Sequence, residues 1–535
     1  MSAPLFLIVD YNLSRIDEVR HLSDHARERH GARVVLIRAA PTAADRALAD
    51  EVIDLDPLRD DFAEMGLKLL GDRRERIVAG VVFSDNAVHS GAELLDRLGV
   101  AVDAPQLAQG AFSKFRYRLE EARVARLLAA QRIMVPAFAE IASLDQLRAF
   151  AREHPGGFVV KPSAEGNNRG VVVVRPGDDL TAAFAEVLPY LEGGVICEEF
   201  IPYRREYSYD GVGPLAFLTE KISAPGRYPV EVAQVLPAVV DAHERATLER
   251  AGRWANALVG QCDGPFHNEI KLSDDGLRAA VVEPNRRPGG MKIWSLARWV
   301  YGIDLHHHWI DTVFATGTTA APGTAATAAA AGAPGATAGT AAGAATTAAG
   351  APGTTAGAAA TTGTTAGTAP GSTAAAGTGT GAGTTATTAT GTGTGAGAGT
   401  GAGAGTGAGA GTGAGAGRLV AGCSAATVLL GVGSDRSFAP ADVADGAEPF
   451  AEAVRATAAQ LSLADGELSV TAFTWLSTER RTLHAVARDN ADFAAQGCVV
   501  LRGNRADIRT VVHTLRTAWP AALDRALTPA VRKAS

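Results

Sequence analysis

Residues 281–290 read VVEPNRRPGG, so an apolar run ends in an acid, an amide, two arginines and a pair of glycines. Glu283 and Asn285 are two residues apart, and side chains two apart on a strand point to the same face. A buried strand does not normally end in so much charge unless something charged binds there. We therefore expect a binding site for a charged group at this strand end.

A second acid lies in PFHNEIKL (265–272), which has the alternating pattern of a strand. If this strand pairs with 277–285, then Glu269, Glu283 and Asn285 converge. Two carboxylates and an amide oxygen suit Mg²⁺ bound to nucleotide phosphates, whereas two neighbouring acids without a cation repel each other. The alternative is a solvated hairpin with scattered acids.

Residues 156–176 form two β-rich runs joined by a loop, which indicates an antiparallel pair. Lys161 ends the first run, and GNNRG (166–170) is suited to folding its backbone N–H groups around phosphate. The GxxxxGK[ST] pattern of a P-loop is absent. The segment predicts a triphosphate clamp, with an ordinary hairpin as the alternative.

CEEFIPYRRE (197–206) follows another predicted strand. Backbone groups and one glutamate in this stretch can hold a purine, a second glutamate can hold ribose hydroxyls, and Phe200 with Ile201 can supply apolar contact. The alternative is a solvated acidic strand end. Tyr203, Glu220, Lys221 and Trp294 are further candidates for lining a substrate pocket.

The first hundred residues alternate strands and helices, which predicts a parallel α/β sheet. We expect strands at 4–9, 33–37 and 79–84, and helices at 15–28 and 87–98. Further along, helices are expected at 111–130, 178–191 and 241–259. Strands at 425–433 and 497–504, with a helix at 505–526, predict a small α+β unit at the end of the chain.

One long segment, 315–417, contains only Ala, Gly and Thr apart from four prolines and Ser372. It has little apolar surface to offset its ordering entropy, so we expect a disordered linker. Its silk-like last part leaves stacked sheets as an alternative. Without it, the charged fraction rises to about 25%, the usual value for globular domains.

The net charge of −7 offers no electrostatic case for binding nucleic acid or anionic membranes. The four cysteines are scattered, which argues against a disulfide framework and fits a reducing compartment; we expect them to be small core residues. No apolar run reaches the ~18 residues of a membrane-spanning helix. We expect a cytoplasmic protein.

Three consecutive histidines, 306–308, invite a metal-binding interpretation. Successive residues of a helix point about 100° apart, so the three cannot all face one ion.

Together and in this order, the motifs around Lys114, Lys161, Glu206, Glu269 and Glu283 resemble the ATP-grasp superfamily, and most closely its carboxylate–amine ligases, such as the L-amino-acid ligases. The resemblance implies an ATP-grasp fold of α/β and α+β parts. Its expected domains are an N-terminal parallel α/β domain (1–105), an ATP-grasp domain (106–314, with lobes of about 115–195 and 196–314), the linker (315–417) and a C-terminal α+β subdomain that completes the ligase (418–535).

The resemblance also implies roles for individual residues. Catalysis would involve Arg287 and Lys161. Two ions of Mg²⁺, or of Mn²⁺, are expected, held by Glu269, Glu283 and Asn285. Substrate would be contacted by His267, Arg287, Gly289 and Gly290. ATP would be bound by Lys114, Lys161, Gly166, Asn168, Arg169, Gly170, Glu198, Glu199, Phe200, Ile201 and Glu206.

Two residues depart from the family's pattern. Arg204 stands where the family often has Gly in the hinge. Arg286 stands where it often has Pro in N-P-R-x-G-G, so Arg287 takes the place of the family's arginine. Arg286 is then extra, either as a solvated surface charge or as a contact to an acidic substrate.

The implied activity is ATP-dependent formation of an amide between a carboxylate, expected to be an amino acid, and an amine. The reaction would pass through an acyl phosphate and give ADP and phosphate. Small-molecule substrates are the expected partners, without nucleic acid or membrane, and a homodimer is left open. The alternatives are an ATP-grasp carboxylase, a purine-pathway type of ligase, or a regulatory protein that binds ATP without turnover.

Overall fold

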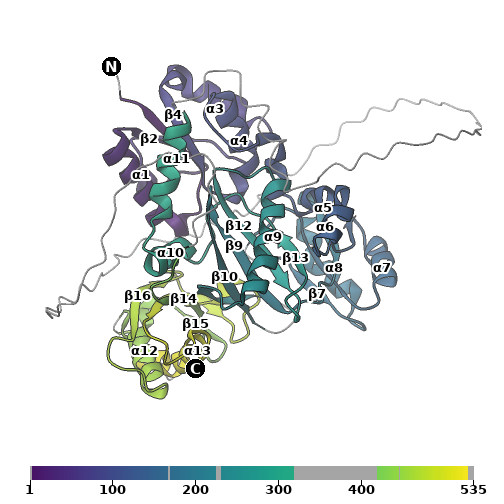
Figure 1. Ribbon diagram of the computed structural model, residues 1–535, viewed down its shortest axis with the longest axis vertical. Coiled ribbons are helices and arrows are strands. Elements are labelled where there is room, and N and C mark those ends of the chain that lie inside the picture. Colours follow the sequence, from purple (N-terminus) through teal and green to yellow (C-terminus); the bar gives the residue numbers. More distant parts are fainter. Residues whose placement is uncertain (1–2, 167–168, 225–229, 318–418, 445, 528–535) are drawn as a thin grey trace, which may run out of the picture. The chain divides into compact units, whose positions relative to one another are not determined.

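Four β-sheets organise the part of the chain that the structure describes (Figure 1). The computed structural model describes residues 3–166, 169–224, 230–317, 419–444 and 446–527. In chain order the strands are β1 (Leu5–Val9), β2 (Arg33–Arg38), β3 (Glu51–Asp54), β4 (Ile77–Val82), β5 (Phe138–Ile141), β6 (Phe158–Pro162), β7 (Val172–Val174), β8 (Val195–Glu199), β9 (Arg205–Val212), β10 (Leu215–Ser223), β11 (Glu231–Leu236), β12 (Pro265–Leu272), β13 (Ala279–Glu283), β14 (Ser424–Leu430), β15 (Arg436–Phe438), β16 (Leu468–Trp475), β17 (Arg481–Leu483) and β18 (Ala495–Leu501).

Helices cover these sheets, and all described residues belong to one compact unit. The α-helices are α1 (Ile16–His30), α2 (Ala43–Leu48), α3 (Phe62–Leu70), α4 (Val88–Arg97), α5 (Lys114–Arg123), α6 (Ala125–Ala130), α7 (Leu144–Glu153), α8 (Leu180–Val187), α9 (Ala242–Leu258), α10 (Ile293–Tyr301), α11 (Leu305–Gly317), α12 (Glu448–Gln460) and α13 (Ile508–Ala526).

The first sheet is parallel, in the order β3-β2-β1-β4, which confirms the predicted N-terminal α/β arrangement. Because alternate residues of a strand face opposite sides, β1 contributes to two cores. Phe6 and Ile8 pack with residues of α1 and α11, whereas Leu5, Leu7 and Val9 pack with α3 and α4. Both faces of the sheet are therefore buried, as a parallel sheet requires.

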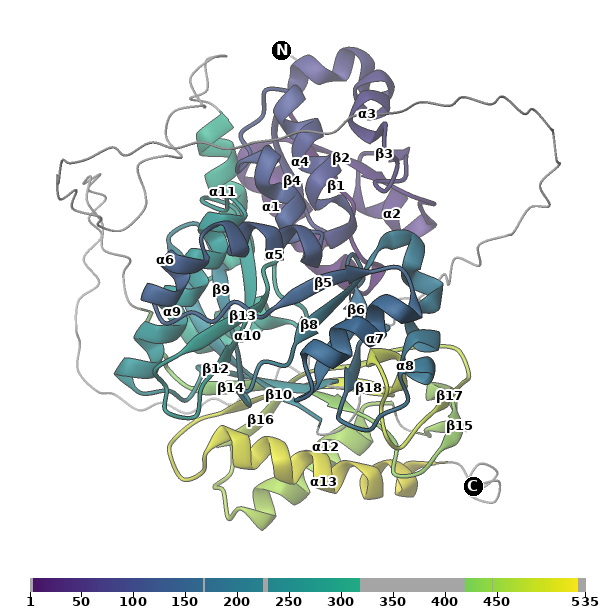
Figure 2. The ribbon, with the colours of Figure 1, turned by 90° about the vertical axis from the view of Figure 1, so that its right-hand side faces the viewer.

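Helix α11 comes from a segment about 300 residues after α1, yet it packs beside α1 and against β4 (Figures 1 and 2). Its Trp309, Ile310 and Phe314 are part of the same core as Phe6. The N-terminal sheet is thereby anchored to α11, the second helix after the GG pair.

A smaller antiparallel sheet, β5-β8-β6-β7, carries Lys161 at the end of β6. Strands β6 and β7 pair as the predicted hairpin, with Phe158 opposite Val174. Helices α7 and α8 close one side of this sheet through the core formed by Leu147, Phe150 and Val187.

The largest sheet runs β13-β12-β9-β10-β11-β14-β18-β16. Strand β11 pairs with β14, with Val235 opposite Ala426, so strands from both sides of the low-complexity segment share one sheet. Helices α12 and α13 lie side by side and pack against the strands contributed by the C-terminal part of the chain (Figure 2). The last part of the chain therefore extends the sheet that carries Glu269 and Glu283.

Several predicted elements differ in their bounds. The expected helix 111–130 begins at Lys114 and is interrupted at Val124, giving α5 and α6, and the expected helix 178–191 ends at Val187. The predicted linker begins at Ala315, but 315–317 form the end of α11. The rest of that predicted linker lies outside the described residues.

No helix among the described residues has the length and apolar character needed to cross a membrane.

Candidate active site

The acids of the two predicted magnesium strands face each other. Strands β12 and β13 are antiparallel, and Glu269 is paired directly with Glu283. A register shift follows this pair, between Glu269 and Ile270. Directly opposed carboxylates repel each other unless cations neutralise them, so the charges placed around this pair determine what it can bind.

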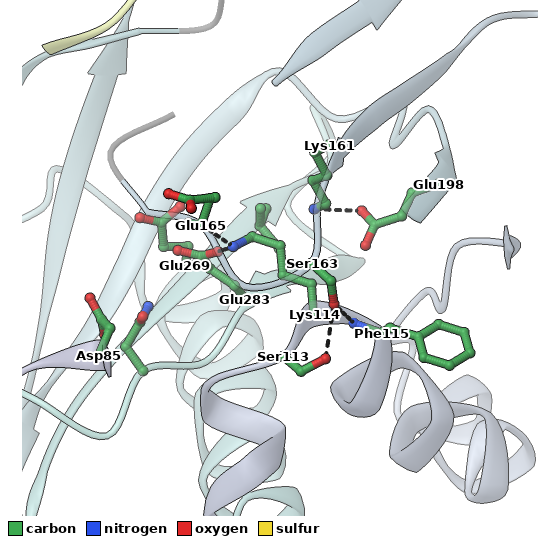
Figure 3. Close-up of polar contacts among 12 residues, drawn as sticks. Asp85, Ser113, Lys114, Phe115, Lys161, Ser163, Glu165, Glu198, Glu269 and Glu283 are labelled. Atoms are coloured by element: carbon green, nitrogen blue, oxygen red, sulfur yellow. Dashed lines mark hydrogen bonds and ion pairs between the residues drawn. The ribbon is translucent and has the colours of Figure 1, made fainter. Parts of the chain in front are cut away.

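Lys114 supplies one of those cations. Its Nζ lies 2.9 Å from Glu283 Oε2 and donates to the Glu165 carbonyl at 2.8 Å (Figure 3). Burial alone would lower the pKa of Lys114, but Glu283, with smaller contributions from Asp85 and Glu198, raises the pKa overall. The ammonium therefore stays charged between the acid pair and the loop that follows Lys161.

The start of α5 holds Lys114 in this position. Ser113 caps the helix and its Oγ lies 2.9 Å from Ser163 Oγ, while the Lys114 N–H donates to the Ser163 carbonyl at 2.9 Å (Figure 3). Ser163 also accepts the Phe115 N–H at 3.2 Å. Sequence reasoning missed Ser163, although its place two residues after Lys161 could have signalled a link between the two lysines.

Lys161 and Glu198 form a buried pair, with Nζ 2.8 Å from Oε2. Arg118 Nε donates to the other oxygen, Glu198 Oε1, at 2.9 Å. Burial alone would raise the pKa of Glu198, but Arg118 and Lys161 together hold it at about 2. Burial lowers the pKa of Lys161; Glu198 opposes this, but Arg118 and Lys114 act in the same direction as burial and the pKa stays lowered. A phosphate placed beside Lys161 would relieve this crowding of positive charge.

The loop between β6 and β7 lies partly within the described residues. Gly170 has φ of +67°, and a Cβ there would lie 2.7 Å from the Tyr190 ring, so the position requires glycine. Gly166 has open space around it, and Arg169 pairs with Glu165 at 2.6 Å. Asn168 lies outside the described residues.

The predicted hinge residues have different environments. Glu198 is buried in the pair just described, whereas Glu199 accepts the Ala137 N–H at 3.2 Å. Phe200 is exposed and Ile201 is buried. Glu206 pairs with Lys271 at 2.9 Å and accepts the Ser223 hydroxyl. The adenine and ribose roles of these residues remain predictions.

A second buried charge network surrounds Glu269. Lys221, a candidate pocket residue, donates to Glu269, and His267 Nε2 lies 3.4 Å from it. His267 Nδ1 in turn lies 2.6 Å from Asp210 Oδ1. Burial would lower the pKa of His267, but Asp210 and, to a smaller extent, Glu269 raise the pKa to about 9.

Asp210 was missed by sequence reasoning. It is fully buried in the middle of β9, and its second oxygen accepts the hydroxyls of Ser208 (2.6 Å) and Thr219 (2.8 Å). The sequence signal was weak, because β9 (REYSYDGV) also contains Arg205, Glu206 and Ser208. These contacts fix the orientation of the His267 ring beside Glu269.

Asn285 and Arg287 lie together after β13. Arg287 Nη2 is 3.4 Å from Asn285 Oδ1, and Arg287 Nε donates to Asp85 Oδ1 at 2.7 Å. Asp85 follows the carboxyl end of β4, where ligands of open parallel sheets commonly bind. Burial alone would lower the pKa of Arg287, but Asp85, together with Glu283 and Glu269, raises the pKa overall. The N-terminal sheet thus positions the arginine predicted to hold the reacting carboxylate.

Both roles suggested for Arg286 from the sequence are wrong. It is buried, and its guanidinium donates to the backbone carbonyls of Asp103, Ala104 and Val259. Burial lowers its pKa to about 10. It is neither a solvated surface charge nor a side chain turned toward a substrate; it ties the strand end to the 103–104 segment.

The two glycines have unequal surroundings. A Cβ on Gly289 would lie 2.6 Å from Ile293 Cδ1 and 2.9 Å from His267 Nδ1, whereas nothing lies within 4 Å of one on Gly290. Left-handed φ values occur instead at Met291 (51°) and Lys292 (62°). Gly289 is therefore required by close packing, and the turn itself uses the two residues after the glycines.

The four cysteines are free. Cys197 and Cys498 are buried as expected, but Cys262 is exposed.

Part of the chain is similar in sequence to known ligases. No protein-family model matches the chain. The alanine–anticapsin ligase of Bacillus amyloliquefaciens is 24% identical over 198 residues, covering 32% of this chain and 42% of that protein. The D-alanine–D-alanine ligase of Acidiphilium cryptum is 29% identical over 157 residues, covering 28% and 50%. The chain thus spans half or less of the length of these curated relatives.

Solved structures match over almost the whole chain. The L-amino acid ligase from Bacillus licheniformis superposes with a TM-score of 0.58 at 13% identity, covering 98% of both chains. N5-carboxyaminoimidazole ribonucleotide synthetase in its ADP complex has a TM-score of 0.54 at 12% identity, covering 98% of this chain and 99% of the other. These relatives and structural neighbours are ATP-grasp enzymes. The likeness to the solved structures shows that the chain has the ATP-grasp fold.

Proposed function

We propose that this protein is an ATP-dependent carboxylate–amine ligase that activates an amino-acid carboxylate as an acyl phosphate. The observation that carries the proposal is the opposed pair Glu269–Glu283, with Lys114 joining Glu283 to the loop after Lys161. This arrangement brings oxygen ligands for a cation next to ammonium groups that suit phosphates.

The donor set fits Mg²⁺. Glu269, Glu283 and Asn285 offer hard oxygen ligands, and both carboxylates already lie against cations, Lys221 and Lys114. The two carboxylates carry two negative charges, which a divalent ion can neutralise. When bound there, Mg²⁺ would offset charge on the phosphate oxygens of ATP.

The chain's own residues would position the reactants. Lys114 and Lys161 would hold phosphate oxygens, and Arg287, oriented by Asp85, would hold the substrate carboxylate through its forked guanidinium. The carboxylate oxygen would attack the γ-phosphate and release ADP. The amine would then attack the acyl carbon, forming the amide as phosphate leaves. His267, oriented by Asp210, would sit beside Glu269 as a positioning residue.

The test is a screen of amino-acid pairs for release of ADP and phosphate in Mg²⁺, with product masses recorded. We expect release that needs both a carboxylate and an amine substrate. Glu283→Gln should lower kcat by roughly 100-fold or more, the scale expected for loss of a preorganised charge. The matched control is Glu140→Gln, at an exposed acid on β5, which should retain full activity. A fully active Glu283→Gln enzyme would contradict the metal assignment.

A second candidate is a carboxylase of the purine-pathway type, favoured by the likeness to N5-carboxyaminoimidazole ribonucleotide synthetase. Bicarbonate-dependent release of ADP without any amino acid would support it. ATP binding with no release across the whole panel would instead indicate a regulatory protein.

A further inference from the structure

Five of the twelve histidines of the chain gather where α1 and α11 pack together. His21, His25 and His30 lie on α1, and His306 and His307 lie in the first turn of α11. The two helices lie side by side on the N-terminal sheet (Figure 1). None of these histidines has a place in the proposed ligase reaction.

The three consecutive histidines do not converge, as their helical spacing predicts. His306 lies 3.3 Å from Glu18, whereas His307 stacks on His25 with ring centroids 3.8 Å apart and planes at 10°. The side chains that do converge come from both α1 and α11.

One such group has its donor atoms aimed at a single point. His25 Nε2 lies 2.9 Å and His30 Nε2 lies 2.8 Å from the same oxygen, Asp311 Oδ1. All three donor atoms are within 4.8 Å of one another. Tetrahedral zinc, with bonds of about 2.0–2.2 Å, places its ligands about 3.3 Å apart. The two N···O separations therefore need to lengthen by only about 0.5 Å to match the spacing of ligands around such an ion.

The two imidazoles are held in place by other rings. His25 stacks on His307, and His30 stacks on Phe314 with centroids 4.0 Å apart and planes at 1°. Both side chains are mostly buried, at 13% and 20% exposure, whereas Asp311 is 48% exposed. The two nitrogen donors are thus preorganised. The Asp311 carboxylate is half exposed, so it can adjust its position and solvent can reach it.

Two other groups of acids with His or Cys occur in the described residues, and in each group one aspartate already accepts backbone N–H groups. Asp304, beside His21 and His307, accepts two backbone N–H groups of α11 and pairs with Arg298. Asp103, beside Cys262 and Asp263, accepts the N–H groups of Asp263 and Gly264. Within the described ranges, the hydrogen bonds of the Asp311 carboxylate are those with His25 and His30.

We propose that His25, His30 and Asp311 form a binding site for a divalent transition-metal ion of the zinc type, with water in the remaining position. Two imidazole nitrogens and one carboxylate oxygen suit Zn²⁺ and related ions and do not suit Mg²⁺. This site is separate from the acid pair on β12 and β13.

The ion would join segments more than 280 residues apart in the chain. Arg15, just before α1, donates to the Pro288 carbonyl at 2.8 Å, next to Arg287. Metal bound near the C-terminal end of α1 would therefore stabilise this helix, and the residue just before its N-terminal end contacts Pro288 beside Arg287. Its role is structural, because it links the N-terminal sheet to the helix after the active site.

The test uses the full chain with millimolar Mg²⁺ present and Zn²⁺ as the probe. Histidines are modified with diethyl pyrocarbonate and quantified by peptide mass spectrometry. At a Zn²⁺ concentration that gives roughly 90% occupancy, modification of His25 and His30 should be about tenfold slower. The exposed His243 and His513 are internal controls and should be modified at unchanged rates.

The paired variants are Asp311→Asn, which removes a ligand, and His513→Gln, which does not. Zn²⁺ should raise the thermal unfolding midpoint of wild type and His513→Gln, but not of Asp311→Asn. The metal-free Asp311→Asn protein should match the circular dichroism of wild type, and His30→Gln provides a second ligand variant. Equal protection of all histidines, or protection of His21 and His307 in place of His25 and His30, would overturn the proposal.

Discussion

Arg286 illustrates how a single residue can be misjudged from its neighbours in sequence. In VVEPNRRPGG it stands next to the arginine predicted to bind substrate, and both look equally available. In the folded protein the two side chains have separate partners: Arg287 pairs with Asp85, whereas Arg286 donates to three backbone carbonyls. The chemistry of a guanidinium suits both tasks, so only position distinguishes them.

Replacing Arg286 with Met should therefore affect stability more than catalysis. Three buried carbonyls would lose their donor, at a cost of about 1–3 kcal/mol in the free energy of unfolding. We expect a lower midpoint in urea and thermal unfolding, with KM values of the folded enzyme unchanged. Arg204→Met, at an exposed hinge arginine paired with Asp274, is the control and should unfold like wild type. A stable Arg286→Met enzyme with a raised substrate KM would favour the substrate-contact interpretation instead.

At the scale of elements, antiparallel pairing of β12 and β13 converts two separate motifs into one site. The sequence predicts both strands and the shared face of Glu283 and Asn285. The register that sets Glu269 opposite Glu283 is a property of the pair. The segment after β13 then brings Gly289 against the His267–Asp210 contact, so a loop residue limits how a strand residue can be oriented.

The glycine pair offers a matched comparison of this constraint. In Gly289→Ala the new methyl group would lie 3.1 Å or less from Ile293, His267 and Asp210. Displacing His267 by even about 1 Å can cost on the order of 100-fold in rate. Gly290→Ala adds its methyl group to open space and should remain near wild-type activity. Steady-state kinetics of the two variants provide the measurement, and equal activity would show that Gly289 packing does not control the site.

At the scale of the whole molecule, the large sheet joins both sides of the low-complexity segment. Strand β14 pairs with β11 on one edge and β18 on the other, so 419–527 completes a sheet begun before residue 317. The core beneath it combines Ala233 and Val235 with residues of α12 and α13. The C-terminal part therefore shares its core with the ATP-grasp sheet.

Replacing 318–417 with a Gly/Ser linker of about 20 residues, with a mean reach of roughly 25 Å, should leave kcat within about twofold of wild type, because chain-entropy costs change slowly with loop length. Ending the chain after Gly317 is the contrasting variant. It removes β14, β16 and β18 and should abolish folded enzyme. Expression, thermal unfolding and ADP release are compared for the two. Loss of soluble activity in the linker variant would show that the segment itself is required.

The sequence by itself determined the residue types, their order and most of the strands and helices, because these depend on local periodicity and turn chemistry. It predicted the parallel N-terminal sheet, the β6–β7 hairpin and the ATP-grasp resemblance. Helix breaks such as Val124 were missed because apolar spacing continues through them. Tertiary structure alone decided that Lys114 meets Glu283, that Asp85 orients Arg287, that Arg286 is buried, and that His25 and His30 meet Asp311. Each of these contacts joins residues far apart in the chain, and their proximity depends on how the sheets and helices pack, which local patterns do not encode.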